Sequence, residues 1–186
     1  MKIYNPKLTL CALATLSAMS FTSHAALTPS YSFNGNGNWS IDGCGSNNTP
    51  TCSIDAVVPT GSTIEAAFLY STNTPSSATP TVNFDGTTFS GADWTSLGAN
   101  NAFLEAFRVD VTSLVSAAVG GGGAAPFSFD ILSENPTGGI DGEALAIVYS
   151  NPAETLRSIA FLDGFSQTTG DSAFISLADP LTAADL

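Results

Sequence analysis

Carboxylates are nearly the whole chemical inventory of this chain. The sequence holds 16 Asp and Glu residues against 4 Lys and Arg, and its one histidine is His24. Both lysines and Cys11 also stand within residues 1–25. Serine and cysteine nucleophiles need a neighbouring base, which His or Lys normally supplies. Beyond residue 25 the chain lacks the usual groups for nucleophilic catalysis, so we expect that it is not an enzyme.

Catalysis by carboxylates alone is the alternative. Glycosidases work with two Asp or Glu residues that flank the bond to be cleaved. The sequence does not place two acids at such a separation, so a carboxylate-dependent glycan-active enzyme is the less favoured hypothesis. The acids that would serve it are Asp130, Glu134, Asp141, Glu143 and Asp163.

Some of these acids suggest a different chemistry, the binding of a hard cation. Asp141 and Glu143 close a polar loop, residues 133–143, and Asp163 and Asp171 bound another. Ca²⁺ takes oxygen ligands from loops of this composition, although neither loop has the EF-hand pattern. Asp and Gly also serve turns for conformational reasons alone. Ca²⁺ is therefore a candidate cofactor, and a polar turn without metal is the simpler interpretation.

Two arginines and two tryptophans complete the candidate site residues. Arg108 and Arg157 lie in apolar stretches of an acidic chain, which predicts structural ion pairs; a site for an anionic ligand is the alternative. Trp39 and Trp94 would suit the face of a sugar, although the core is the usual place of an aromatic side chain in a β-sandwich and is the favoured interpretation. Trp94 follows the loop-like stretch Ser-Gly-Ala-Asp, so the sequence predicts that Trp94 is the better exposed candidate.

Residues 1–25 have the pattern of a secretory signal peptide. Lys2 and Lys7 precede an apolar run, residues 8–19, and small residues stand at the two positions that a signal peptidase reads. The run is too short to cross a bilayer, which disfavours a membrane anchor. We expect a mature chain that starts at Ala26 and is secreted or held at the cell surface of a bacterium.

Export gives a reason for the two remaining cysteines. Cys44 and Cys52 bound a turn-rich stretch, and oxidising compartments favour a disulfide there. A metal site would need further Cys or His ligands, which the mature sequence does not contain. In the chain-entropy model, closing so short a loop stabilises the fold by about 2.5 kcal/mol.

The net charge of −12 limits the partners of the chain. Nucleic acids and anionic membranes both attract basic surfaces, so neither is an expected partner. Beyond residues 8–19 the sequence also contains no long apolar stretch that could span a bilayer. A glycan or another cell-surface protein remains as the expected partner.

Short stretches with period-two alternation follow one another between turns rich in Gly, Ser, Asn and Pro, which predicts β-strands. The clearest lie at residues 63–70, 102–109, 126–132, 143–149, 156–162 and 172–177. The stretch 143–149 is almost wholly apolar, as expected of a central strand. Weaker candidates lie at residues 31–33, 38–42, 53–58, 81–84 and 87–90.

Two local signals interrupt this pattern. Asp85-Gly86 stands between two alternating runs and predicts a two-residue hairpin turn. Residues 111–119 have helical spacing, with Asp110 or Thr112 as the capping residue and glycines 120–123 as the end.

About ten short strands and one short helix near 111–119 predict an all-β fold, an antiparallel β-sandwich of the jelly-roll type. We expect a single domain over residues 26–186. The sequence stops just past the last expected strand, which predicts a chain truncated at its C-terminal end relative to a longer protein.

The order of five motifs resembles a known family. They are Thr-Ile-Glu-Ala-Ala-Phe-Leu-Tyr (63–70), Val-Asn-Phe-Asp-Gly-Thr-Thr (82–88), Arg-Val-Asp-Val-Thr-Ser-Leu-Val (108–115), Asp-Gly-Glu-Ala-Leu-Ala-Ile-Val-Tyr-Ser-Asn-Pro (141–152) and Leu-Arg-Ser-Ile-Ala-Phe-Leu-Asp-Gly-Phe (156–165). Over about residues 35–178 the chain is similar to an uncharacterised N-terminal domain of exported bacterial cell-surface proteins, some with sorting tails of the PEP-CTERM kind or adhesin-like repeats. The resemblance implies a secreted β-sandwich, without catalytic residues to carry over.

Together these features predict a secreted, non-catalytic module for the cell surface, adhesion or the extracellular matrix. A carbohydrate-binding module is the alternative, for which an exposed Trp39 or Trp94 would serve as the platform.

Overall fold

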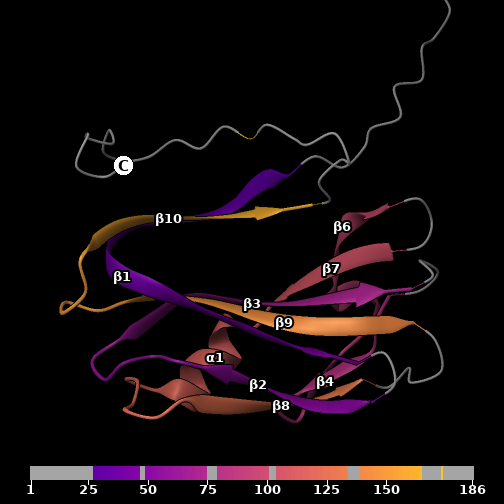
Figure 1. Ribbon diagram of the computed structural model, residues 1–186, viewed down its shortest axis with the longest axis horizontal. Helices are drawn as coiled ribbons and strands as arrows, with labels where there is room; N and C mark the ends of the chain where they lie inside the picture. Colours follow the sequence, from indigo (N-terminus) through magenta and orange to yellow (C-terminus); the bar gives the residue numbers. More distant parts are fainter. Residues whose placement is uncertain are drawn as a thin grey trace, which may run out of the picture.

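The computed structural model describes residues 27–46, 49–74, 79–100, 104–133, 139–164 and 173. Within them the chain forms ten β-strands, one α-helix and one turn of 3-10 helix. The strands make two antiparallel sheets that face each other, so the predicted all-β sandwich is confirmed (Figure 1). The predicted signal peptide, the predicted strand at 172–177 and Asp171 lie outside the described residues.

The larger sheet has six strands in the order β10-β1-β9-β3-β7-β6. In that order they span Leu156–Asp163, Thr28–Gly45, Ile140–Ser150, Thr63–Asn73, Leu104–Asp110 and Thr95–Asn100. The smaller sheet has the order β2-β8-β4-β5, with bounds Thr51–Ala56, Phe127–Ser133, Val82–Phe84 and Thr87–Phe89. The helical segments are η1 (Gly91–Asp93) and α1 (Thr112–Val119).

The strand order is that of a jelly roll. The pairs β1–β9, β2–β8, β3–β7 and β4–β5 nest inside one another like a long hairpin, and successive pairs belong to opposite sheets. Winding such a hairpin around one core produces two four-stranded sheets. Here β10 and β6 extend one of the two. The predicted jelly roll is therefore confirmed.

Alternation along the strands supplies the core between the sheets. On β8, Phe129 and Ile131 are buried while Ser128 and Asp130 are exposed, as a strand with one wet face requires. Phe129 stacks on Phe84 of β4 with 5.2 Å between ring centroids. The strand β9 pairs with both β1 and β3, which confirms the expected central position of this apolar stretch.

The two local signals are also confirmed. Asp85 and Gly86 have φ of 47° and 85°, and they form the two-residue turn between β4 and β5. The helix α1 begins at Thr112, and its N-cap residue is Val111 and not Asp110 or Thr112 as predicted. Asp110 still contributes to the helix start, because its Oδ1 accepts a hydrogen bond from the Thr112 N–H at 2.8 Å. The helix ends at Gly120, where φ is 58°.

The first strand differs from the prediction, because β1 is one strand of 18 residues where the sequence predicts two short ones. Residues 28–36 pair with β10, and residues 37–45 pair with β9. Gly35 and Gly37 stand next to this change of partner, and the Phe33 ring packs against both of them. Residues 28–36 and β10 form a two-stranded layer, here called the outer ribbon, that lies above β3 and β9 in Figure 1.

Aromatic contacts hold the outer ribbon on the sheet beneath it. Phe68 of β3 lies 5.7 Å from Tyr31 and 6.2 Å from Phe161, measured between ring centroids. Tyr31 and Phe161 come from the two strands of the ribbon. The larger sheet is therefore covered on both faces over part of its area: by the smaller sheet inside, and by the ribbon outside.

The predicted disulfide between Cys44 and Cys52 is present and joins the end of β1 to β2. It therefore ties the two sheets together at one end of the sandwich. Side chains of β1 also protect the open edge of β2: Ser40 Oγ accepts from Val57 N at 3.0 Å, and Asp42 Oδ2 accepts from Asp55 N at 2.8 Å.

One strand was not predicted. In β6 the residues other than Leu97 are small or polar and the strand is interrupted by a bulge near Gly98, where φ is 102°, so no alternation is visible in the sequence. In the part of the chain that the structure describes, no helix is long and apolar enough to cross a membrane.

Candidate functional site

A groove of about 430 Å³ crosses the outer face of the larger sheet, beside the outer ribbon. This volume lies in the range of sites that hold small ligands. The lining, which is mostly apolar, consists of Ile41, Tyr70, Thr72, Leu97, Ala106, Ala144, Ala146 and residues 160–164. The groove therefore takes residues from β1, β3, β6, β7, β9 and β10.

Small side chains create the depth of the groove. Ala144 lies opposite Tyr70, and Ala146 lies opposite Ile41, on neighbouring strands. Ala106 of β7 is a third alanine of the lining. Side chains one strand apart on the same face touch each other, so larger residues here would fill the groove. The strands thus form a floor between the higher walls of Ile41 and the ribbon.

A polar cluster stands at the ribbon side of the groove. Asp163 accepts hydrogen bonds from Arg108 Nη1 and from the Tyr70 hydroxyl, the latter at 2.8 Å. The Arg108 guanidinium also lies over the Phe68 ring, 4.8 Å from its centroid. Burial, and then the hydrogen bond to Asp163, raises the pKa of Tyr70 above its usual value, so the hydroxyl stays a donor. The predicted ion pair of Arg108 is confirmed.

Trp39 lies on β1 next to the groove. It is 52% exposed, and Ile41, two residues further along the same face of the strand, is 53% exposed. Neighbouring exposed apolar side chains of this kind can mark an interaction site. Since Ile41 is part of the groove lining, Trp39 extends the groove toward the bend of β1.

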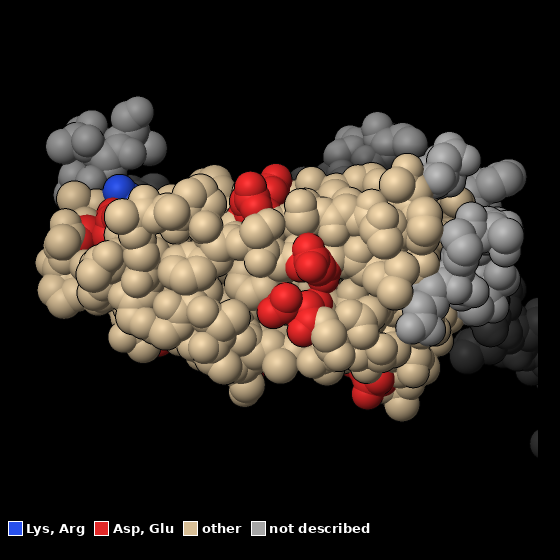
Figure 2. All heavy atoms as spheres, turned by 90° about the horizontal axis from the view of Figure 1, so that it is seen from below, with Lys and Arg blue, Asp and Glu red and all other residues tan. Residues whose placement is uncertain are grey.

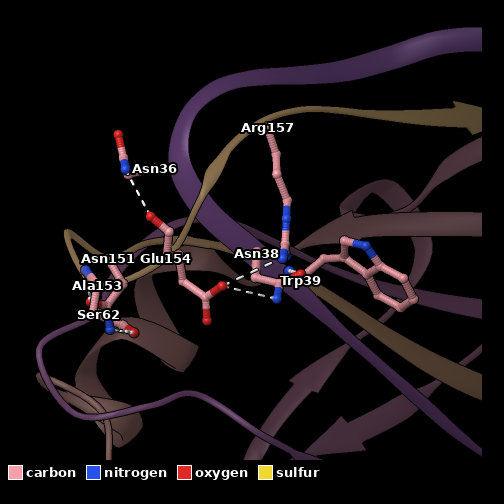
Figure 3. A network of polar contacts seen from close by, with 8 residues as sticks. All are labelled: Asn36, Asn38, Trp39, Ser62, Asn151, Ala153, Glu154 and Arg157. Atoms are coloured by element: carbon pink, nitrogen blue, oxygen red, sulfur yellow. Dashed lines mark hydrogen bonds and ion pairs between the residues drawn. The ribbon is translucent and has the colours of Figure 1, made fainter. Parts of the chain in front are cut away.

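Figure 3 shows a polar network next to Trp39 on β1, with the side chains of Asn38 and Trp39 pointing in opposite directions. Glu154, in the connection between β9 and β10, accepts a hydrogen bond from Asn38 Nδ2 at 3.3 Å and lies 3.7 Å from Arg157 Nη1. Asn36 Nδ2 donates to the Glu154 carbonyl at 2.7 Å. The predicted ion pair of Arg157 is thus confirmed; it is exposed to water, so it adds little to stability.

Trp94 corrects the prediction that it is the better exposed indole. It is 7% exposed and packs against Phe89 in an edge-to-face arrangement, with ring centroids 6.3 Å apart. The loop-like residues before it form η1, which turns the indole into the space between the two sheets. Trp94 is therefore a core residue, and Trp39 is the exposed one.

Glu143 is buried inside the sandwich and not in the groove. It is 4% exposed, and its carboxylate accepts hydrogen bonds from the hydroxyls of Ser46 and Ser133, the latter at 2.7 Å. Ser46 follows β1 and Ser133 ends β8, so this one side chain connects both sheets. Burial raises the pKa of Glu143 above its usual value, and the two hydrogen bonds lower it by less.

This burial has a consequence for stability against pH. The raised pKa means that the folded state favours protonated Glu143, so unfolding releases a proton above pH 4.5, the ordinary pKa. The free energy of unfolding should fall as pH rises from there through the raised pKa of Glu143. Urea unfolding at a series of pH values measures this slope, which Glu143→Gln should remove. The control is Glu65→Gln on an exposed position of β3; equal slopes in wild type and Glu143→Gln would contradict the assignment.

The acids proposed as calcium ligands do not converge within the described residues. Glu143 points into the sandwich, Asp163 lies on the outer face of the larger sheet, and Asp141 is exposed. The described residues contain one group of three possible ligands within 4.8 Å, formed by Cys44, Cys52 and Glu143. Its two sulfurs are joined in the disulfide and offer no thiolate to a metal.

Other exposed acids lie on the far side of the sandwich. Asp55 of β2 and Asp130 of β8 point outward from the smaller sheet. Figure 2, which views the molecule from this side, shows separate groups of acidic side chains, with a basic atom visible at one end of the view. This face is acidic and without a cluster that could hold a metal among its described residues.

The sequence did not predict the groove itself, because its lining comes from six strands. Arg108, Arg157, Asp163 and Tyr70 were candidate residues, but Glu154 and Asn38 carried no signal apart from their types. The alanines at 144 and 146 were visible as an alternating pair of small residues, which is the one sequence signal for a hollow in the sheet. Comparison of the chain with protein-family models, with curated proteins and with solved structures finds no match.

Proposed function

We propose that this chain is a secreted, non-catalytic binding module that acts at a bacterial cell surface or in the extracellular matrix. Its ligand would lie in the groove on the outer face of the larger sheet. The observation that carries the proposal is the groove, since it combines a small apolar floor with a fixed polar cluster at one side. Ligand sites commonly have this composition.

Two further features support export and binding. The Cys44–Cys52 disulfide suits an oxidising compartment outside the cytoplasm. The side chains at the groove are also held in place before any ligand arrives, because Arg108, Tyr70 and Asp163 bind one another. A preorganised site loses less conformational entropy when it binds.

A carbohydrate-binding module is the second candidate, and the exposure of Trp39 favours it. An indole that is half exposed offers its flat face to the C–H face of a sugar ring. Glu154 and Arg157, near the same bend of β1, are groups that bind hydroxyls. The two candidates share one surface and differ in the chemistry of the ligand.

A glycan-active enzyme is the weaker candidate. Glycosidases hold two carboxyl groups about 5 to 9.5 Å apart across the cleft. The carboxylate that lines the described part of the groove is Asp163, and Arg108 and Tyr70 engage its two oxygens. Release of reducing sugar from any glycan, abolished by Asp163→Asn, would favour the enzyme over the binding module.

The proposal is tested by comparing two substitutions to phenylalanine, one inside the groove and one outside it. Ala144→Phe places a large ring on the groove floor, and Ser128→Phe places one on the exposed face of the smaller sheet. Fluorescent protein is applied to bacterial cells and to a glycan array, with and without Ca²⁺. We expect wild type and Ser128→Phe to bind, and Ala144→Phe to bind at least about tenfold more weakly.

Ile41→Ala gives a second test of the groove if Ala144→Phe lowers the melting temperature. Ile41 is an exposed wall residue, so its truncation leaves the core intact. Binding of both groove variants with wild-type affinity would overturn the proposal. A requirement for Ca²⁺ would show that a metal contributes to the interaction.

A further inference from the structure

We propose that the ligand of this surface is an uncharged glycan chain, with one sugar ring stacked on Trp39 and the chain continuing over Ile41 into the groove. The inference rests on the proposed function and adds the chemical class of the ligand. Three observations carry it: the exposure of Trp39, the paired polar groups near the bend of β1 and at the groove, and the balance of charge at the site.

The first observation is the position of the indole. Trp39 and Ile41 project from the same face of β1, since side chains two residues apart on a strand share a face. Both are about half exposed, and Ile41 belongs to the groove lining. An extended ligand that covers Trp39 therefore meets Ile41 next and the alanine floor after it.

The second observation is the arrangement of donors and acceptors near Trp39. Arg157 presents N–H groups and Glu154 presents carboxylate oxygens near the bend of β1, whereas the side chain of Asn38, the strand neighbour of Trp39, points away from the indole (Figure 3). A sugar hydroxyl both donates and accepts a hydrogen bond, so it needs both kinds of partner close together. At the other end of the surface, Tyr70 and Asp163 offer a hydroxyl and a carboxylate in the same way.

The third observation selects an uncharged glycan. Arg157 is paired with Glu154, and Arg108 is paired with Asp163. The described residues contain no other Lys or Arg, and the whole chain carries a net charge of −12. A uronate or sulfate group would meet no unpaired cation and would approach a protein of the same sign. A chain of neutral sugars meets neither obstacle.

Affinity electrophoresis tests this with two sets of soluble polysaccharides. The neutral set is β-glucan, mannan and galactan, and the acidic set is alginate and polygalacturonate. We expect a neutral polysaccharide to retard the wild-type chain and the acidic set to leave its mobility unchanged. Trp39→Ala should weaken the retardation about tenfold, as the loss of one stacked ring implies, and Trp39→Phe should retain part of it.

The controls separate this inference from the proposed function. Leu132→Ala removes an exposed apolar side chain from the smaller sheet and should bind as wild type. Binding to the neutral polysaccharide should not change between low and high salt, because no net charge is neutralised. Binding of the acidic set alone, wild-type affinity in Trp39→Ala, or no retardation at all would overturn the inference. If the inference is overturned in this way but Ala144→Phe still weakens binding to cells, the proposed binding function of the groove is retained and only the uncharged glycan as its ligand is rejected.

Discussion

Asp163→Ala should lower the free energy of unfolding by about 3 kcal/mol, near the lower end for breaking a buried ion pair. The side chain of Asp163 is almost fully buried, and it is the partner of both Arg108 and the Tyr70 hydroxyl. Alanine would leave the guanidinium between the outer ribbon and the sheet without a carboxylate. Because the pair joins β10 to β7, the loss should be felt first in the outer ribbon. Urea unfolding measures the free energy, and amide hydrogen exchange of β10 measures the local loosening.

The Glu154–Arg157 pair provides the control for this prediction. It is a pair of the same chemical kind that is exposed to water, with 3.7 Å between its charged atoms. Glu154→Ala should cost less than about 1 kcal/mol, as exposed pairs do. Equal costs for the two variants would show that burial of Asp163 does not determine its importance. Unchanged exchange in β10 would show that the ribbon is held by its aromatic contacts alone.

Gly37→Ala should cost about 3 kcal/mol, the upper end of the range for overpacking. A Cβ at this position would collide with the Tyr149 carbonyl oxygen and lie 2.8 Å from Phe33 Cε1. The carbonyl belongs to the backbone of the central strand β9 and cannot turn aside. The chain would have to separate β1 from β9 at the place where β1 changes partner. Thermal unfolding should show a lower midpoint, and Trp39 should lose its fixed position next to the bend.

Gly45→Ala is the matched control, since it is the same substitution in the same strand. A Cβ at Gly45 would find its nearest neighbour, the Asp141 carbonyl oxygen, at 3.9 Å, which is ordinary contact. Neither glycine has a positive φ, so the comparison measures space and not backbone strain. We expect Gly45→Ala to unfold within about 0.5 kcal/mol of wild type. A similar loss in both variants would mean that glycine is needed throughout β1 and that the bend is not special.

Both predictions concern the outer ribbon, and the ribbon also forms one wall of the groove. Phe161, Leu162 and Asp163 line the groove, and the bend at Gly37 sets where the ribbon leaves the sheet. Variants that loosen the ribbon should therefore weaken binding as well as stability. Trp39→Ala should weaken binding alone, because its side chain is exposed.

The sequence predicted most of the fold, for reasons that are local. Alternation identified the strands with one wet face, such as β8, and the apolar run of β9 identified the centre of the larger sheet. A two-residue hairpin turn needs positive φ at both of its residues, and Asp85 and Gly86 are residue types that adopt positive φ readily. The number and spacing of the strands favoured a jelly roll, but the pairing of particular strands was seen only in the structure. The strand β6 was not predicted, because apolar and polar residues do not alternate along it.

The candidate site was predicted in part. Arg108 and Arg157 form the expected ion pairs. In a chain with many more acidic than basic residues, an arginine has a carboxylate within reach at most positions of the fold. The exposure of the two tryptophans was reversed. A loop-like sequence before Trp94 says nothing about which way its indole turns, and the strand that carries Trp39 says nothing about what covers its outer face.

The amino-acid sequence by itself determined which residues share a face of a strand, where the tight turns fall, that two cysteines can join, and that His and Lys occur only within residues 1–25. These properties depend on neighbours within a few residues or on composition. Only the tertiary structure decided that Glu143 lies inside the sandwich, that the Asp163 side chain joins the ribbon to Tyr70 and Arg108 of the sheet, and that a groove opens beside Trp39. Each of those outcomes depends on contacts between strands far apart in the chain, and alternation cannot show which of two faces another layer will cover.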